Sequence, residues 1–169
     1  MGFFDRFRAK RDETAALYAA LVARARQPHW YLDGAVADTV DGRFDMIAAV
    51  LAMVMLRLEA DPTGVAAAAH LSEAFVDDMD PQLREIGIGD LLVGKHVGRM
   101  MGALGGRIGA FREARSTGDF APAVNRNIFH EAPSSDQAAA WVAARIARIV
   151  GDLDSASLAD LLAGKVPMP

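Results

Sequence analysis

The sequence predicts an all-α protein, a single compact bundle of about six to eight helices. Alanine, leucine, arginine and methionine, which favour helices, dominate the chain. Segments typical of β-strands are almost absent. Proline and glycine divide the remainder into segments of helical length. The 169 residues are 52% hydrophobic and 24% charged, which suits one globular domain.

The chain is predicted to consist of an N-terminal amphipathic segment, residues 1–12, and one helical domain, residues 13–165. The first segment places Phe3, Phe4 and Phe7 within a short turn and lacks the long apolar stretch of a signal peptide. No linker long enough to separate two domains is present. Helices are expected at residues 13–26, 38–58, 63–77, 81–87, 91–115, 119–131, 136–151 and 156–163.

Proline, aspartate, serine and glycine mark the expected helix ends. Pro28 ends the first helix, and Asp38 or Thr39 caps the second. The second helix is apolar nearly all round at residues 46–56, so it is expected at the centre of the bundle. That run is too short to span a bilayer, which needs about 20 apolar residues. A soluble or peripheral protein is therefore expected.

The same residue types mark the expected helix ends in the second half of the chain. Asp80, with Pro81 in the first turn, is expected to begin a separate short helix that ends at Gly87. Asp90 is expected to cap the longest helix, and Gly118 to close it. The candidate caps of the last helices are Ser134, Ser135 and Ser155.

Composition excludes several classes of function. The chain has no cysteine, which removes disulfides, thiolate metal sites and cysteine nucleophiles and fits a reducing cytoplasm. The net charge of −4 argues against a general nucleic-acid binder. The four histidines form no metal-binding pair, and no serine lies in a GxSxG motif. We therefore predict neither an enzyme nor a bound cofactor or metal.

Two acidic clusters need an explanation. Asp38, Asp41 and Asp45 share one helix face, for which a solvated or arginine-paired surface is favoured over a metal site. In DMDPQLREIGIGD, residues 78–90, helix caps and salt bridges explain part of the charge. They explain Asp77, Asp78 and Asp80 less well, because clustered carboxylates repel one another unless a positive group meets them.

The stretch GKHVGRMMGALGGRIG, residues 94–109, is rich in glycine at four-residue spacing. Each glycine inside a helix costs about 0.5–1 kcal/mol relative to alanine. Tight packing against a neighbouring helix of the same chain is the favoured explanation, and a docking groove for a foreign helix is the alternative. A phosphate loop is rejected, because the GxxxxGK[ST] pattern is missing and no strand precedes it.

Apolar side chains offer further candidate contacts. Trp30 and Tyr31 follow Pro28 and are expected in an exposed loop. The eight methionines are expected mostly in the core, although methionine surfaces adapt to varied partners.

Three stretches in this order resemble one known family. They are LYAALVARARQPHWYLDGAVADTVDGRFDMI, DDMDPQLREIGIGDLLVGKHVGRM and GRIGAFREA. They are similar to the ubiquinol–cytochrome c chaperone family, assembly factors for the cytochrome b subunit of the respiratory ubiquinol–cytochrome c reductase. The resemblance covers roughly residues 15–130, and DMDPQLREIGIGD followed by VGKHV is its most specific part.

The resemblance implies a non-enzymatic, all-helical chaperone that receives newly made cytochrome b. A ribosome or a second assembly factor is an implied further partner. A bacterial member at the cytoplasmic face of the inner membrane, in peripheral contact with it, fits a chain without a transit peptide. Motif and charge together give the candidate partner-binding residues: Trp30, Tyr31, Asp41, Arg43, Asp77, Asp78, Asp80, Arg84, Glu85 and Lys95.

Two other functions stay open at this point. One is an enzyme or cofactor protein with a helical site built from Asp41, Asp90 and His96. The other is a helical scaffold or membrane-surface adaptor that has no role in the reductase and rests on the membrane through residues 3–7.

Overall fold

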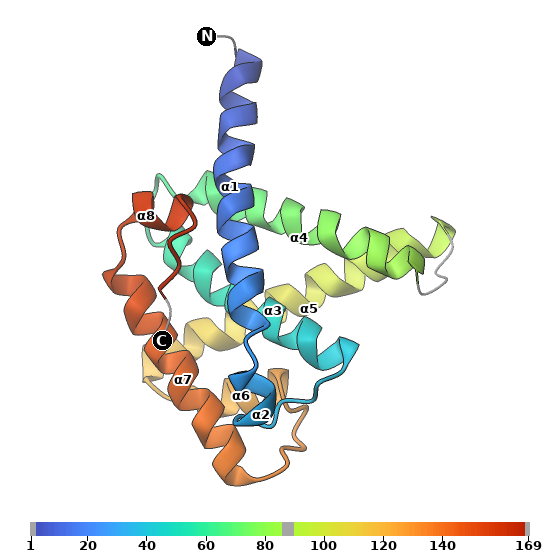
Figure 1. Ribbon diagram of the computed structural model, residues 1–169, viewed down its shortest axis with the longest axis vertical. Coiled ribbons are helices and arrows are strands. Elements are labelled where there is room, and N and C mark those ends of the chain that lie inside the picture. The colour runs from blue at the N-terminus through green and yellow to red at the C-terminus, as the bar shows by residue number, and fades with distance from the viewer. Residues whose placement is uncertain (1–2, 86–89, 168–169) are drawn as a thin grey trace.

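The computed structural model is all-α, as the sequence predicts, and contains no strand among the residues that it describes. It describes the backbone of residues 3–85 and 90–167 and the side chains of residues 14–79 and 94–167. The helices, shown in Figure 1, are α1 (Phe3–Ala25), α2 (His29–Leu32), α3 (Val40–Glu59), α4 (Val65–Glu85), α5 (Asp90–Thr117), α6 (Ala121–Asn127), α7 (Asp136–Ser155) and α8 (Leu158–Leu162).

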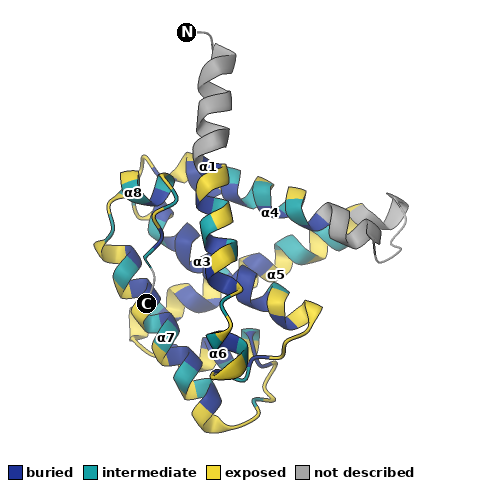
Figure 2. Ribbon diagram, in the orientation of Figure 1, coloured by how far each residue is buried: buried dark blue, intermediate teal, exposed yellow. Residues whose placement is uncertain are grey.

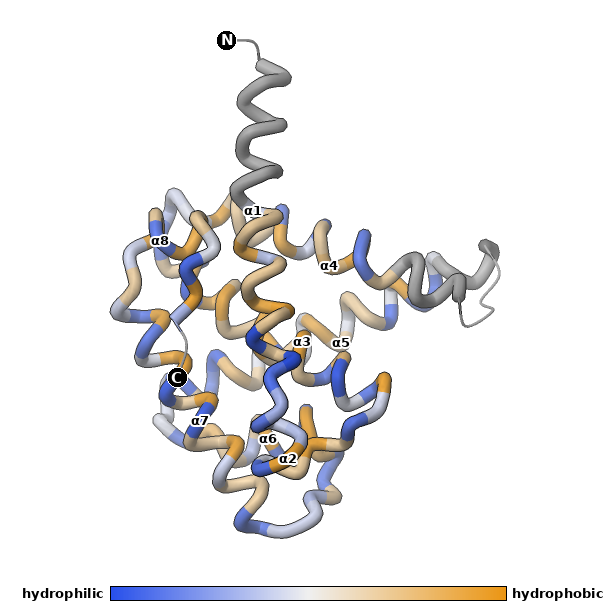
Figure 3. Tube along the Cα trace, viewed as in Figure 1, coloured by the Kyte–Doolittle hydropathy of each residue, from blue (hydrophilic) through white to orange (hydrophobic). Residues whose placement is uncertain are grey.

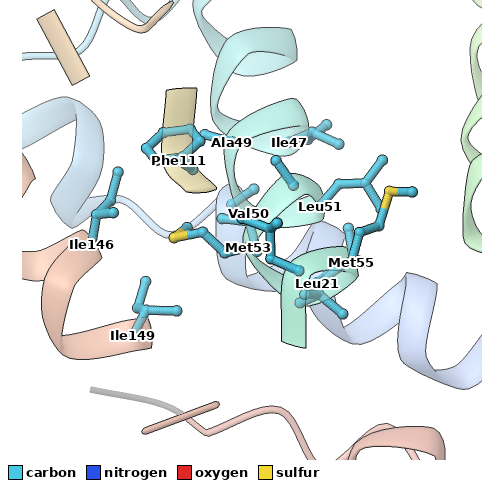
Figure 4. Close-up of a cluster of buried hydrophobic side chains, with 14 of the residues drawn as sticks. Leu21, Ile47, Ala49, Val50, Leu51, Met53, Met55, Phe111, Ile146 and Ile149 are labelled. Carbon is cyan, nitrogen blue, oxygen red and sulfur yellow. The ribbon is translucent and has the colours of Figure 1, made fainter. Parts of the chain in front are cut away.

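Helix α3 lies at the centre of the bundle, as its apolar sequence predicts. Every residue from 46 to 56 is buried, and α3 packs against α1, α4, α5 and α7. Figure 2 shows this central burial, and Figure 4 shows Val50 of α3 among Leu21, Phe111 and Ile146 of three other helices. A helix surrounded on all sides has no polar face, which explains its continuous apolar run.

Several predicted helix ends are confirmed. The Thr39 hydroxyl accepts the Gly42 N–H at 3.1 Å at the start of α3. The Ser135 hydroxyl likewise accepts the Ala138 N–H at 3.1 Å at the start of α7. Gly118 follows α5 with a φ of +76°, a left-handed conformation that glycine adopts without strain.

The expected break between Asp77 and Asp80 is wrong, because α4 continues through both residues. Leu71, Phe75 and Met79 are buried at four-residue spacing along this stretch. This apolar stripe holds one helix together although Pro81 lacks the N–H of a regular helical bond. The expected end at Gly87 lies outside the described residues.

Two other boundaries also differ from expectation. Helix α1 is continuous from Phe3 to Ala25, where a separate turn at residues 2–9 was expected. At the other end of the chain, Ser155 is the last residue of α7, and Ser157 caps α8 by accepting the Asp160 N–H at 3.1 Å. From the sequence, Ser155 and Ser157 are equally suitable caps for the last helix. In the structure α7 extends to Ser155, which leaves Ser157 to cap α8. The division into residues 1–12 and 13–165 stays a prediction.

The C-terminal half of α4 and the N-terminal half of α5 project together from the bundle (Figure 1). Polar and apolar residues alternate along α4, α5 and α7 (Figure 3). Among the described residues, no helix combines the length and the apolar character that a membrane span requires.

Candidate functional site

A hollow of about 400 Å³ lies between α1 and α4, and we call it the acidic groove. Tyr18 of α1 forms one side, and its hydroxyl donates to Asp78 Oδ2 at 2.9 Å. Burial, and then this bond to Asp78, raise the pKa of Tyr18, so it stays a neutral donor. His70, Glu73 and Asp77 of α4 also line the hollow. They stand three and four residues apart, on one helix face.

The acidic groove takes its name from three carboxylates. Glu73, Asp77 and Asp78 of α4 line it, and the Asp78 carboxylate accepts the Tyr18 hydroxyl. Asp77 and Asp78 were expected to lie together, and the helix places both here. The side chains of the other residues expected in this cluster, Asp80, Arg84 and Glu85, lie outside the described side chains.

A second group of candidates meets at the corner between α2 and α3. The Arg43 guanidinium lies 5.8 Å from the ring centroid of Tyr31, and Arg43 Nε donates to Asp38 Oδ1 at 2.7 Å. The Tyr31 hydroxyl donates to the Ala25 carbonyl at 2.9 Å. Asp41 is exposed in the first turn of α3. This corner therefore displays an ordered tyrosine and arginine beside solvent.

Trp30 is not part of that exposed corner, and the expectation that it lies in an exposed loop is wrong. Its side chain is fully buried, and Nε1 donates to the Arg24 carbonyl at 3.0 Å. The residues after Pro28 form helix α2, which turns Trp30 inward against Trp141 with ring centroids 6.2 Å apart. The neighbouring Leu32 is the exposed apolar side chain instead, at 79% exposure.

Within the part of the chain that the structure describes, the glycines of α5 do not pack against another helix, which contradicts the favoured explanation. They are exposed, and a Cβ placed on any of them meets no atom within 4 Å beyond its own helix. We call this surface the glycine face of α5; its residues are Gly94, Gly98, Gly102, Gly105, Gly106 and Gly109. Lys95, another candidate, is exposed on the same helix, and the structure does not bring it to the acidic groove.

Most of the methionines whose side chains the structure describes are core residues, as expected. Met46, Met53, Met55 and Met79 are buried. A methionine contact surface is therefore not assembled from these four residues.

A buried charge cluster joins three parts of the chain. Asp45 of α3 forms a buried ion pair with Arg107 of α5, and His130 Nε2 bonds to Asp45 Oδ2 at 2.7 Å. Burial raises the pKa of Asp45, although the hydrogen bond from His130 and the charge of Arg107 oppose that shift. The expected single face of Asp38, Asp41 and Asp45 is wrong, because Asp38 lies before α3 and Asp45 is buried, but the expected arginine pairing is found for Asp38 with Arg43 and for Asp45 with Arg107. The cluster at Asp45 joins α3, α5 and the loop after α6.

Sequence reasoning missed the partners in these clusters for different reasons. The spacing of His70, Glu73 and Asp77 on one helix face was a usable signal for the acidic groove. No local signal joins Asp45 to Arg107, because 62 residues separate them. Within the described residues, no three acidic or histidine side chains come together as a metal site.

Comparison with known proteins places this bundle in context. Residues 32–168 match the sequence model of a family described as ubiquinol-cytochrome C chaperone. Among solved structures, the chain is similar to the crystal structure of the Cbp3 homolog from Brucella abortus, with a TM-score of 0.83 and 29% sequence identity. That match covers 97% of this chain and 92% of the other. No curated protein matches.

Proposed function

The chain belongs to the ubiquinol–cytochrome c chaperone family, and on this premise we propose that it binds newly made cytochrome b without catalysing a reaction. In doing so it supports assembly of the ubiquinol–cytochrome c reductase. The observation that carries the proposal is the family match over residues 32–168, together with the likeness to the Cbp3 homolog. We further propose that the protein acts at the cytoplasmic face of the membrane, in peripheral contact with it. There a ribosome or a second assembly factor would be its other partner.

The acidic groove is the proposed contact for charged loops of the client. Cytochrome b is a polytopic membrane protein, and cytoplasmic loops of such proteins are enriched in lysine and arginine. Asp77 and Asp78 line a hollow of about 400 Å³, which accommodates a basic side chain. Asp80, Arg84 and Glu85 follow on the same helix and extend the proposed contact.

The glycine face of α5 is the proposed support for an apolar helix of the client. Within a helix, each of its glycines costs about 0.5–1 kcal/mol relative to alanine, and no described contact of the chain compensates that cost. Small residues at four-residue spacing let two helix backbones approach closely, and this pattern is common between membrane helices. Lys95 lies at the start of this face, where it can meet a polar end of the client helix.

The corner between α2 and α3 is the proposed third contact. Leu32 and Val40 are 79% and 75% exposed, beside the ordered pair of Tyr31 and Arg43. Exposed apolar side chains framed by polar ones are typical of protein contact sites. Asp41 lies in the same turn of α3 as Arg43 and completes this corner.

A deletion strain tests the proposed function. Membranes of the strain should lose b-type haem absorbance and assembled reductase, and restoring the gene should recover both. Normal reductase in the deletion strain would contradict the proposal. In that case a scaffold or membrane-surface adaptor would replace it.

A charge reversal tests the acidic groove. The full chain carrying Asp77→Lys and Asp78→Lys should bind a lysine-rich loop peptide of cytochrome b more weakly. A control with Glu113→Lys on α5 and Asp136→Lys on α7, both exposed positions, changes the net charge equally and should bind normally. Tyr18→Phe removes the hydrogen bond to Asp78 but keeps the charge of the groove. It therefore separates the effect of the lost carboxylate charges from the effect of the lost Tyr18–Asp78 hydrogen bond. Undiminished binding by a folded Asp77/Asp78 variant would exclude the groove.

A further inference from the structure

The N-terminal half of α7 carries a fixed aromatic side chain beside α2. Helices α2 and α7 lie side by side there (Figure 1), and the Trp141 ring packs against His29 and Trp30 at centroid distances of 6.0 and 6.2 Å. Trp141 is only half-buried. One part of its ring is therefore held by α2, and another part meets solvent.

Two arginines share the side of α7 that carries this ring. Arg145 and Arg148 follow Trp141 by four and seven residues, a spacing that places all three on one helix face. We call these three residues the α7 face. None of them belongs to the acidic groove, the glycine face of α5 or the corner between α2 and α3.

The Arg145 guanidinium is ordered by the ring and still has free donors. Its central carbon lies 4.4 Å from the centroid of the Trp141 ring, and the side chain is half-buried. A guanidinium has five N–H donors, which a contact with a ring does not satisfy. Among the residues that the structure describes, none accepts a hydrogen bond from Arg145 or Arg148 or forms an ion pair with either.

The charge around the α7 face is positive, although the chain as a whole has a net charge of −4. Burial, and then the charges of Arg145 and Arg24, lower the pKa of His29, and only Asp33 opposes them. Arg24 is fully buried, so it acts here through its charge and not by contact. Asp152 of α7 is the carboxylate that acts on Arg24. With Arg148, three arginines therefore outnumber two carboxylates in this region.

We propose that the α7 face docks an acidic segment of a partner polypeptide, with a glutamate or aspartate carboxylate held by Arg145. A planar guanidinium binds a carboxylate through two parallel N–H···O bonds. Because the Trp141 ring already restricts the Arg145 side chain, less conformational entropy is lost when the carboxylate binds. An apolar side chain beside the acid covers the exposed part of Trp141. Tryptophan and arginine are also the residues that most often dominate binding energy at protein interfaces.

A polypeptide fits the α7 face better than a nucleic acid or an anionic membrane does. Those partners are bound through many phosphate contacts, whereas this face offers two accessible arginines, and the net charge of −4 repels an extended anionic surface. The inference goes beyond the proposed function and holds whatever the client is.

The test uses the full chain, labelled with ¹⁵N, and the peptide Ser-Gly-Glu-Leu-Glu-Gly-Ser with both ends blocked. The chain has two tryptophans, so a Trp141→Phe variant assigns both indole N–H signals. Titration should shift the Trp141 signal saturably. The Trp30 indole, which is buried and bonded to the Arg24 carbonyl at 3.0 Å, should move less. A peptide with glutamine in place of both glutamates should bind about tenfold or more weakly.

Variants of the protein connect the shift to the α7 face. Arg145→Gln should weaken binding of the acidic peptide about tenfold or more. Arg145→Lys keeps the charge and loses the paired donors, so its affinity should lie between those of Arg145→Gln and the wild type. Arg112→Gln on α5 also removes one exposed arginine, outside every proposed contact, and should leave binding unchanged. A thermal melt followed by circular dichroism shows that each variant is folded.

Four results would overturn the proposal. The first is an absence of a saturable Trp141 shift up to tens of millimolar peptide. The second is equal binding of the glutamine peptide, and the third is undiminished binding by the folded Arg145→Gln variant. The fourth is tighter binding at this signal by an oligonucleotide or by anionic phospholipid vesicles, because the partner would then belong to another class.

The outcome is separate from that of the client role. The peptide contains no cytochrome b sequence, and its binding is measured on the purified chain. A failure here is therefore distinct from a failure of the proposed function, which the deletion strain tests.

Discussion

Replacing glycines on the glycine face of α5 by alanine should make the protein more stable. Gly98, Gly102 and Gly105 are exposed, and a Cβ at each meets no neighbouring atom within 4 Å. Alanine avoids the backbone entropy cost of glycine in a helix, about 0.5–1 kcal/mol per position. The triple variant should therefore gain about 1.5–3 kcal/mol in unfolding free energy. For a chain of this length that corresponds to a rise in Tm of roughly 3–12 °C.

Urea unfolding followed by circular dichroism, with a thermal scan, measures this gain. Gly151→Ala on α7 is the matched control, because Gly151 is also exposed and open, and it should gain about 0.5–1 kcal/mol. Binding of cytochrome b should weaken in the triple variant and stay normal in the control. A triple variant that loses stability would refute the reasoning, because it would mean that another part of the chain packs on this face.

Three further predictions concern buried charges. Asp45→Ala should lower the unfolding free energy by about 3–5 kcal/mol in urea titrations, because Arg107 stays buried without its partner. Glu59→Ala, which breaks the exposed pair with Arg112, should cost less than about 1 kcal/mol, and equal losses would contradict this. Because burial raises the pKa of Asp45 above its ordinary 3.8, the folded state binds that proton more tightly than the unfolded state. The stabilisation that comes from binding this proton is therefore greatest below the ordinary pKa and is lost as the pH rises through the raised one. The unfolding free energy of the wild type minus that of Asp45→Asn should accordingly shrink from acid toward neutral pH, and a growing difference would show the opposite sign. Finally, the buried Arg24 guanidinium has no hydrogen-bond acceptor among the residues that the structure describes, and burial lowers the Arg24 pKa to about 10 against the smaller opposing effect of Asp152. Arg24→Met should then raise the unfolding free energy by about 1–3 kcal/mol, and a lower Tm would show that the arginine has a stabilising partner.

The helices were largely predictable because their signals are local. The apolar run at residues 46–56 predicted a central α3, and Thr39 and Ser135 cap their helices as expected. The Asp80-Pro81 pair misled because both residues are favoured at a helix start. The buried stripe through Leu71, Phe75 and Met79 outweighs that preference and continues α4.

The candidate site was predictable only in part. Asp77 and Asp78 line a groove, and Tyr31 and Arg43 lie together. Trp30 was placed wrongly because the four-residue helix α2 is too short to leave a periodic signal, and it turns that side chain inward. The glycines of α5 were predicted to pack against a neighbouring helix, and they are exposed instead. The glycine spacing in the sequence shows that side chains are absent along one face of the helix. It does not show whether a helix of the same chain or of a partner lies against that face.

The sequence by itself determined the all-α class, the central helix and the family, because propensity, apolar periodicity and motif spacing lie within short stretches of chain. The tertiary structure alone decided which distant residues meet. Tyr18 and Asp78 are 60 residues apart, and Asp45 and His130 are 85 apart. Such contacts depend on how the helices pack, and no pattern within one helix specifies its neighbour. The acidic groove and the buried cluster at Asp45 both arise at that level.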